Sequence, residues 1–202
     1  MSASMSVDVS GLRILIAKLS DPSLKAQLEA LAQEKAVAAM VGQAIAENFE
    51  NEGPGWEPLK AKTIRYSVSK KMRKQYHGMS DKHILRQEAM RRQKGEEPHR
   101  KILQRTGLLK KTATIPGFGG MSYDKKAKTA VSGTNIYKTE GTNLIWGTDL
   151  VYAGVHNKGL PAKNIPKREF LKIPSHWMKE INDFVLGKAL KIIKSSLGTV
   201  SK

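Results

Sequence analysis

Apolar side chains recur at helical spacing in the first fifty residues. A short helix is predicted within residues 8–19 from the spacing of Leu12, Leu15, Ile16 and Leu19. Asp21 followed by Pro22 is typical of a helix start, with the aspartate as N-cap and the proline at the first helical position. Apolar residues then continue at a 3.6-residue period from Leu24 to Phe49. This pattern predicts one long amphipathic helix over about 22–50, ended by Gly53, Pro54 and Gly55.

The end of the chain predicts a last helix that begins near Pro174 and Ser175. Its apolar side consists of Trp177, Ile181, Phe184, Val185 and Ile192, and Gly187 weakens its middle.

The stretch between these helices has a different character. Short runs rich in β-branched residues, at 112–115, 129–132 and 144–148, predict a small antiparallel sheet. Residues 117–120, Gly-Phe-Gly-Gly, predict a turn or loop. The fold class expected from the whole pattern is α+β, with a long N-terminal helix, a small antiparallel sheet and a C-terminal helix in one domain over 1–202.

Charge divides the chain unevenly. The 202 residues carry a net charge of +17, and residues 60–111 alone hold 17 Lys and Arg against 4 Asp and Glu, a net +13. Two helices are expected in this stretch, at about 61–76 and from the Ser80 cap to about Gly95. Their apolar stripes are thin, so we expect a basic helical insertion at 61–101 that is either stabilised by a partner or mobile.

Residue types that carry enzyme chemistry are sparse. The chain has no Cys, which excludes disulfides and thiolate sites. Its five histidines form no compact metal-ligand pattern: His77, His83, His99, His156 and His176. Nucleotide-binding glycine loops and hydrolase elbows are absent from the sequence. We therefore expect no enzymatic activity, no cofactor and no metal.

The sequence also gives an expectation about location. It has no apolar run near the ~18–20 residues that cross a bilayer, and its first residues lack the pattern of a signal peptide. The chain is expected to be cytosolic when made, with no membrane partner.

The basic stretch is a candidate for binding a polyanion. Its pairs of cations could neutralise several phosphates of DNA without reading sequence: Lys70, Lys71, Arg73, Lys74, Arg91 and Arg92. The same charge could equally form a solvated face or contact an acidic protein surface. A sequence-independent DNA-binding protein acting through residues 60–111 therefore remains an alternative function.

Four segments carry recognisable motifs in a fixed order. They are Trp-Glu-Pro-Leu-Lys with Thr63 in residues 49–63, Ile-Leu-Gln-Arg-Thr-Gly-Leu-Leu in 102–109, Gly-Thr with Tyr-Ala-Gly-Val-His-Asn-Lys-Gly in 147–159, and Ile-Pro-Lys-Arg-Glu-Phe-Leu in 165–171. Together they resemble the phage virion morphogenesis or tail-completion proteins, which act near the head–tail junction of tailed bacteriophages. The basic stretch between the first two segments is long for that family, so its role does not follow from the resemblance.

The resemblance implies a structural protein of the virion. Its members complete the tail or join it to the head, and a ring is expected because the tail axis is rotationally symmetric. A hexamer is favoured and a dodecamer is possible. The implied partners are further copies of the chain, the connector, tail-terminator or tail-tube proteins, and the phage genome within the channel. The implied locations are the virion neck or tail and, during assembly, the host cytoplasm.

Physical chemistry alone, without any family, also predicts roles for the residues of these motifs. Trp56 is expected to anchor the loop after the long helix on the core, and Pro58 to fix its backbone. Thr106 reads as an N-cap, with Gly107 allowing a close approach before Leu108 enters the core.

The residues of the third and fourth motifs are also expected to have structural roles. Tyr152 and His156 are four residues apart and should share a helical face, with Gly159 ending that helix. We read His156 as a structural histidine. Arg168 is expected to pair with an acidic residue of its own chain or of a neighbour, and Phe170 to be a core or subunit-interface anchor.

Overall fold

The computed structural model describes residues 3–8, 16, 21–31, 33–53, 55–67, 76–96, 102–104, 106–124, 129–140 and 143–198. Of the helix predicted within 8–19, the structure describes Asp8, which ends a strand, and Ile16, which is helical and buried; the rest lies outside the described residues.

The sheet is antiparallel and has the strand order β1-β4-β3-β2. Its strands are β1 (Ala3–Asp8), β2 (Gly119–Asp124), β3 (Thr129–Glu140) and β4 (Asn143–Thr148). The runs predicted at 129–132 and 144–148 are confirmed as strands, and the turn is confirmed at Gly117, whereas Gly119 and Gly120 already belong to β2. Strand β1 was not predicted; it pairs with β4 so that Met5 faces Trp146. The α+β class is confirmed.

The predicted long N-terminal helix is two helices, α2 (Pro22–Leu31) and α3 (Lys35–Glu50). The start is confirmed, because Asp21 Oδ1 accepts a hydrogen bond from the main-chain nitrogen of Ser23 at 2.8 Å. Two tertiary contacts hold the residues at the break. Tyr137 on β3 donates its hydroxyl to the carbonyl of Gln33, and Lys188 donates to the carboxylate of Glu34, which is the N-cap position of α3.

Residues 112–115 were predicted as a strand, and this was wrong. Thr112 to Thr114 complete α7 (Leu108–Thr114). The threonine hydroxyls fit the helix because they bond to carbonyls one turn earlier, Thr112 Oγ1 to Leu109 at 3.1 Å and Thr114 Oγ1 to Lys110 at 2.8 Å. Burial of Leu108, Leu109 and Thr112 then outweighs the weak helix propensity of the β-branched residues.

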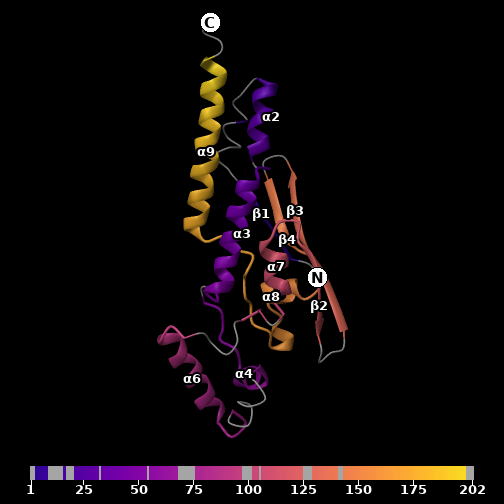
Figure 1. Ribbon diagram of the computed structural model, residues 1–202, viewed down its shortest axis with the longest axis vertical. Coiled ribbons are helices and arrows are strands. Elements are labelled where there is room, and N and C mark those ends of the chain that lie inside the picture. Colours follow the sequence, from indigo (N-terminus) through magenta and orange to yellow (C-terminus); the bar gives the residue numbers. More distant parts are fainter. Residues whose placement is uncertain are drawn as a thin grey trace.

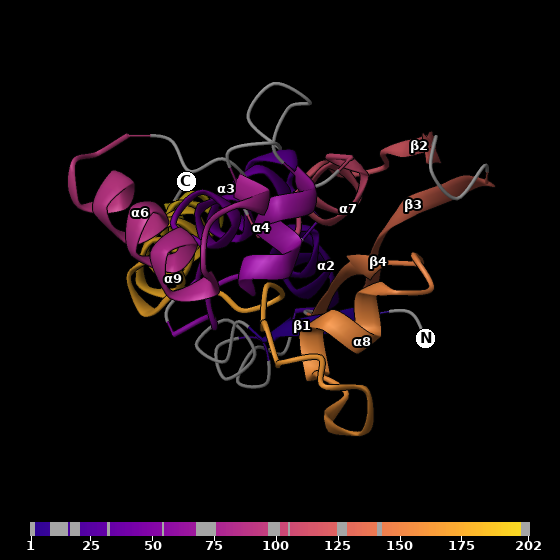
Figure 2. The same cartoon turned by 90° about the horizontal axis from the view of Figure 1, so that it is seen from below.

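The main core lies between the helices and the sheet. The last helix, α9 (Ser175–Gly198), begins at the predicted residue and lies on the far side of α3 from the sheet (Figures 1 and 2). Helix α7 lies between α3 and the sheet (Figure 1). The indole Nε1–H of Trp146 on β4 donates a hydrogen bond to the carbonyl of Ala113 in α7 at 2.6 Å. The largest fully buried side chains of this core include Trp146, Phe49, Phe170, Leu28, Ile45, Leu144, Leu150 and Ile181.

The basic stretch forms an extension at one end of an elongated molecule, opposite the C-terminal end of α9 (Figure 1). It contains α4 (Ala61–Ser67) and α6 (Asp81–Gln93), and residues 68–75 of the helix predicted at 61–76 are outside the described part. The Ser80 cap is confirmed, since its hydroxyl accepts from the main-chain nitrogen of His83 at 3.3 Å. The extension has a small core of its own, made of Ala61, Ile64, Tyr76 and Ile84 with Leu59 and Met79 against it.

One arginine organises this extension. Arg65 of α4 donates from Nε to the carbonyl of Tyr76 at 3.1 Å and from Nη2 to the carbonyl of Met79 at 3.0 Å. The same Nη2 pairs with Asp81 in the first turn of α6 at 2.7 Å. Its charge is therefore used to join α4 to the start of α6, although the sequence shows it only as one more cation of the basic stretch.

Candidate functional site

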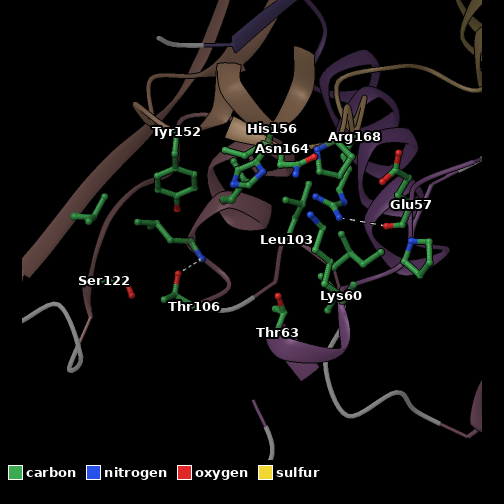
Figure 3. Close-up of a pocket in the computed structure, with 18 residues that line it drawn as sticks. Glu57, Lys60, Thr63, Leu103, Thr106, Ser122, Tyr152, His156, Asn164 and Arg168 are labelled. Atoms are coloured by element: carbon green, nitrogen blue, oxygen red, sulfur yellow. Dashed lines mark hydrogen bonds between the residues drawn. The ribbon is translucent and has the colours of Figure 1, made fainter. Parts of the chain in front are cut away.

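All four motif segments meet around one cavity of 540 Å³. The cavity lies where the helix–sheet body meets α4, near the short helix α8 (Ala153–Lys158) and the 3₁₀ turn η1 (Pro161–Lys163). In Figure 3, Tyr152, His156 and Arg168 lie along one side of it, and Thr106, Thr63 and Lys60 along the other. The first segment contributes residues 57–60 and 63, the second 102, 103, 106, 108 and 109, the third 152 and 156, and the fourth 165, 166 and 168.

Arg168 is the most deeply placed charge of the cavity, with only 7% of its surface exposed. Its main-chain nitrogen donates to the carbonyl of His156 at 2.8 Å, and Nη2 donates to the carbonyl of Glu57 at 3.2 Å. The Nε–H is buried and has no hydrogen-bond partner among the described residues. Burial lowers the pKa of the guanidinium, and the carboxylates of Glu57 and Glu52 oppose that shift. Arg168 was expected to pair with an acidic residue; among the described residues its side chain bonds to the main-chain carbonyl of Glu57, and pairing with a neighbouring chain stays a prediction.

Tyr152 and His156 share a face of α8, as predicted. Tyr152 is the N-cap, and its ring lies 6.1 Å from the imidazole of His156 in an edge-to-face arrangement. The imidazole Nδ1 is buried without a hydrogen-bond partner among the described residues. Burial, and then the charge of Arg168, lower the pKa of His156, while burial raises the pKa of Tyr152. Gly159 ends the helix at φ 78°, where a Cβ would lie 2.8 Å from the main-chain nitrogen of Lys167.

The second motif starts α7 in a way that the sequence did not predict. Gly107, not Thr106, is the N-cap, and its φ of 72° is the left-handed conformation that favours glycine. A Cβ on Gly107 would meet nothing within 4 Å, so the glycine is needed for its backbone angle and not for a close approach. The Thr106 hydroxyl instead accepts from the main-chain nitrogen of Leu108 at 3.4 Å, just outside the helix. Leu108 enters the core as predicted.

Aromatic rings tie the first and fourth motifs together. Phe49 at the end of α3 lies 6.1 Å from Trp56, edge to face, and 5.4 Å from Phe170. Trp56 is half-buried against the core and covers Gly53, and Phe170 is fully buried, so both are anchors as predicted. Pro58 is exposed and lines the cavity.

The predicted cationic contacts divide into two groups. Lys70, Lys71, Arg73 and Lys74 lie outside the described residues. Arg91 and Arg92 on α6 each approach a carboxylate of their own chain, Arg91 that of Glu96 at 3.4 Å and Arg92 that of Glu52 at 2.7 Å.

Glu52 makes Arg92 part of the junction between the extension and the body. One carboxylate oxygen of Glu52 pairs with Arg92, and the other accepts from the main-chain nitrogen of Ile102 at 2.8 Å. Gln104 adds a bond from its side-chain amide to the carbonyl of Phe49 at 2.7 Å. The exposed cations of α6 and its C-cap, which the sequence did not single out, are Lys82, Arg86 and Lys94.

The cavity is lined by both polar and apolar side chains. Within the described ranges, no three His, Asp or Glu side chains gather as a metal ion would require. Ser122, Val131 and Asn164 also line the cavity and were missed, because they stand in segments without a motif. The lining combines hydrogen-bond donors with apolar side chains such as Leu103, Leu109 and Ile165.

Comparison of the chain with models of protein families, with curated proteins and with solved structures gives no match. Within the described part of the chain, no helix combines the length and the apolarity that crossing a bilayer requires.

Proposed function

We propose that this chain is a non-enzymatic structural protein of a tailed bacteriophage that completes the tail or joins it to the head. The observation that carries the proposal is the meeting of the four motif segments around one cavity, although they are spread over residues 49–171. Segments that resemble one family and build one site together are more informative than the same segments scattered over the surface.

The outer strands of the sheet support assembly into a ring. Strands β1 and β2 are the two edges, and β2 carries Met121 and Tyr123, which are 72% and 58% exposed. These side chains are two residues apart and therefore lie on the same face of the strand. An apolar pair on this edge strand suits a head-to-tail contact with a neighbouring copy, and such contacts form a ring when the rotation between copies closes. A hexamer fits the symmetry of a tail axis.

The decisive experiment is negative-stain electron microscopy of a lysate from a phage that lacks this gene. We expect full heads separated from tails that are unattached or malformed, and restoration of joined particles when the gene is supplied in trans. Intact, joined particles in the deletion lysate would contradict the proposal.

A second candidate function is sequence-independent DNA binding, which the exposed face of the extension favours. Lys82, Arg86 and Lys94 are exposed, and they lie in the extension, which has a small core separate from the main one. A polyanion could therefore approach them. Within a virion the same face could line the channel that DNA crosses or could hold an acidic surface of the connector.

Charge removal separates these roles. The triple change of Lys82, Arg86 and Lys94 to Gln is compared with a matched triple change of the exposed Lys179, Lys191 and Lys194 on α9. Normal particles with altered DNA retention would support the channel, and unjoined heads and tails would support protein docking. Loss of salt-sensitive duplex binding by the purified protein, with normal particles and normal DNA retention, would favour the free DNA-binding role. If both triple variants behave as the wild type in all these assays, the exposed face of α6 has none of these roles.

A further inference from the structure

The cavity has a charge pattern that points to a particular kind of occupant. Two cationic side chains line it, Lys60 and Arg168, together with one carboxylate, Glu57. Since burial keeps His156 toward its neutral form, the lining has one positive charge in excess. A cavity with a single excess positive charge is matched by one singly charged anion.

The buried donor of Arg168 is a second, independent observation. A buried N–H without a partner costs about 1–3 kcal/mol, and more when the group is charged. The guanidinium is more than nine-tenths buried, lines the cavity and leaves its Nε–H without a partner among the described residues. A carboxylate can accept two parallel bonds from one guanidinium, so an anion that reached the buried Nε–H would satisfy this donor.

The backbone around the cavity is held in an unusual conformation. Three non-glycine residues among those described have positive φ, and two of them, Leu103 at 60° and Asn164 at 57°, line the cavity. Asn adopts this conformation readily and Asn164 is the C-cap of η1, whereas for Leu103 it costs about 1–3 kcal/mol, and strain of this kind gathers at functional sites. Leu103 brings its side chain to the same cavity as Arg168 and Lys60 (Figure 3).

We propose that this cavity binds an acidic, apolar peptide segment of a partner protein, with an Asp or Glu carboxylate received by Arg168 and Lys60 and the flanking apolar side chain received by Leu103, Leu109 and Val131. The choice of a protein partner rests on the proposed function, in which the neighbours are other proteins of the neck or tail. The volume of 540 Å³ holds a few residues and is far too small for a duplex. The carboxylate of Glu57 disfavours a doubly charged phosphate more than a singly charged carboxylate.

The test uses the full chain and three probes: acetyl-Leu-Glu-Leu-amide, acetyl-Leu-Gln-Leu-amide and inorganic phosphate. Binding is followed by ¹H–¹⁵N NMR, with the Arg168 Nε–Hε signal as the local reporter. We expect the Glu peptide to shift this signal in a saturable way and to bind about tenfold or more tightly than the Gln peptide, as a hydrogen-bonded charge pair implies.

Two substitutions with the same charge change make the test specific. Lys60→Gln removes a cation that lines the cavity, whereas Lys62→Gln removes an exposed cation of α4 that does not. Binding of the Glu peptide should weaken several-fold in the first variant and stay unchanged in the second. This pair keeps the test valid even if Arg168→Gln fails to fold.

Three results would overturn the inference. They are equal binding of both peptides, no shift of the Arg168 signal, and binding of phosphate that is tighter than binding of the Glu peptide, so that phosphate displaces the peptide. The last result would assign the cavity to a phosphate-bearing ligand. Because the probes report on the isolated protein, peptide binding can succeed while the deletion phage forms joined particles, and the reverse. The two failures are therefore distinguishable.

Discussion

The side-chain amide of Asn48, buried within α3, donates to the carbonyl oxygen of Phe170 at 3.1 Å. The same amide donates to the carbonyl of Lys172 at 2.6 Å. Residues 166–170 form no helix or strand, so their main-chain groups take other partners, among them the carbonyl of His156 and the side-chain amide of Asn48. Asn48 thereby fixes the stretch that presents Arg168 to the cavity.

Replacing Asn48 should therefore destabilise the protein. We expect Asn48→Ala to lower the free energy of unfolding by about 2–3 kcal/mol, because two carbonyls lose a partner in a mostly buried position. Urea titration followed by circular dichroism measures the change. Asn51→Ala is the control, since Asn51 is exposed at the C-cap of α3 and should change stability by no more than about 0.5 kcal/mol. Equal losses in the two variants would contradict this role of Asn48.

Glu52 is expected to fasten the basic extension to the body. Glu52→Gln removes the charge that pairs with Arg92 and weakens the bond from the Ile102 main chain. Hydrogen exchange measured by mass spectrometry should speed up across α6 while the sheet keeps its protection. Glu96→Gln, which removes the more exposed partner of Arg91, should leave the exchange of α6 near that of the wild type. Uniform acceleration over the whole chain would show that Glu52 acts on global stability instead.

His156 should make stability depend on pH in one direction. Its pKa in the folded protein is lowered from the ordinary 6.5 by burial and by Arg168, with Tyr152, Lys60 and Glu57 also lining the cavity. The unfolded chain then binds the proton more readily than the folded one. The contribution of neutral His156 is fully present above about pH 6.5 and is lost as the pH falls through the folded pKa.

The measurement is the free energy of unfolding from urea titrations between about pH 7.5 and about pH 5. His156→Gln should flatten the fall in stability below pH 6.5, whereas His77→Gln, an exposed change in the extension, serves as the matched control. A fall of the same steepness in wild type and His156→Gln would show that the imidazole is not responsible.

Replacing each of two helical glycines by alanine should change the stability of the protein in opposite directions. A Cβ on Gly42 would overlap the carbonyl oxygen of Thr114, because α3 and α7 approach closely there. Gly42→Ala should therefore destabilise the protein by about 1–3 kcal/mol. A Cβ on Gly187 in α9 meets nothing within 4 Å, so Gly187→Ala should stabilise by about 0.5–1 kcal/mol. Thermal melts of both variants measure the two signs, and a gain in the first or a loss in the second would contradict the packing described.

Local chemistry made two helix starts predictable, those of α2 and α6, whereas the cap predicted at Thr106 is one residue away, at Gly107. Asp21 and Ser80 accept main-chain hydrogen bonds as caps, and their side chains alone identify that role. The break between α2 and α3 could not be predicted, since the contacts made there come from the hydroxyl of Tyr137 and the ammonium of Lys188, both more than a hundred residues away. Strand β1 is short and is largely defined by pairing with β4, so its sequence gave little signal.

The sequence identified most residues of the candidate site, but it did not predict that they line one cavity. The motifs drew attention to Thr106, Tyr152, His156 and Arg168 individually, and each was read as a folding residue. Their meeting depends on the path of the chain, which places residues 57–60 beside Arg168 across more than a hundred positions. Long-range packing of this kind leaves no local signal in the pattern of side chains.

The pairing of β1 with β4 has a consequence for synthesis on the ribosome. Residues 3–8 must wait for residues 143–148 before the edge of the sheet can form. At about 5–20 residues per second, that interval is on the order of ten seconds, far longer than the microseconds in which a hairpin closes. The hairpin of β3 and β4 can therefore form as soon as it emerges, and β1 can pair only once β4 has been made. The beginning of the chain thus completes the sheet only when most of the protein has already been made.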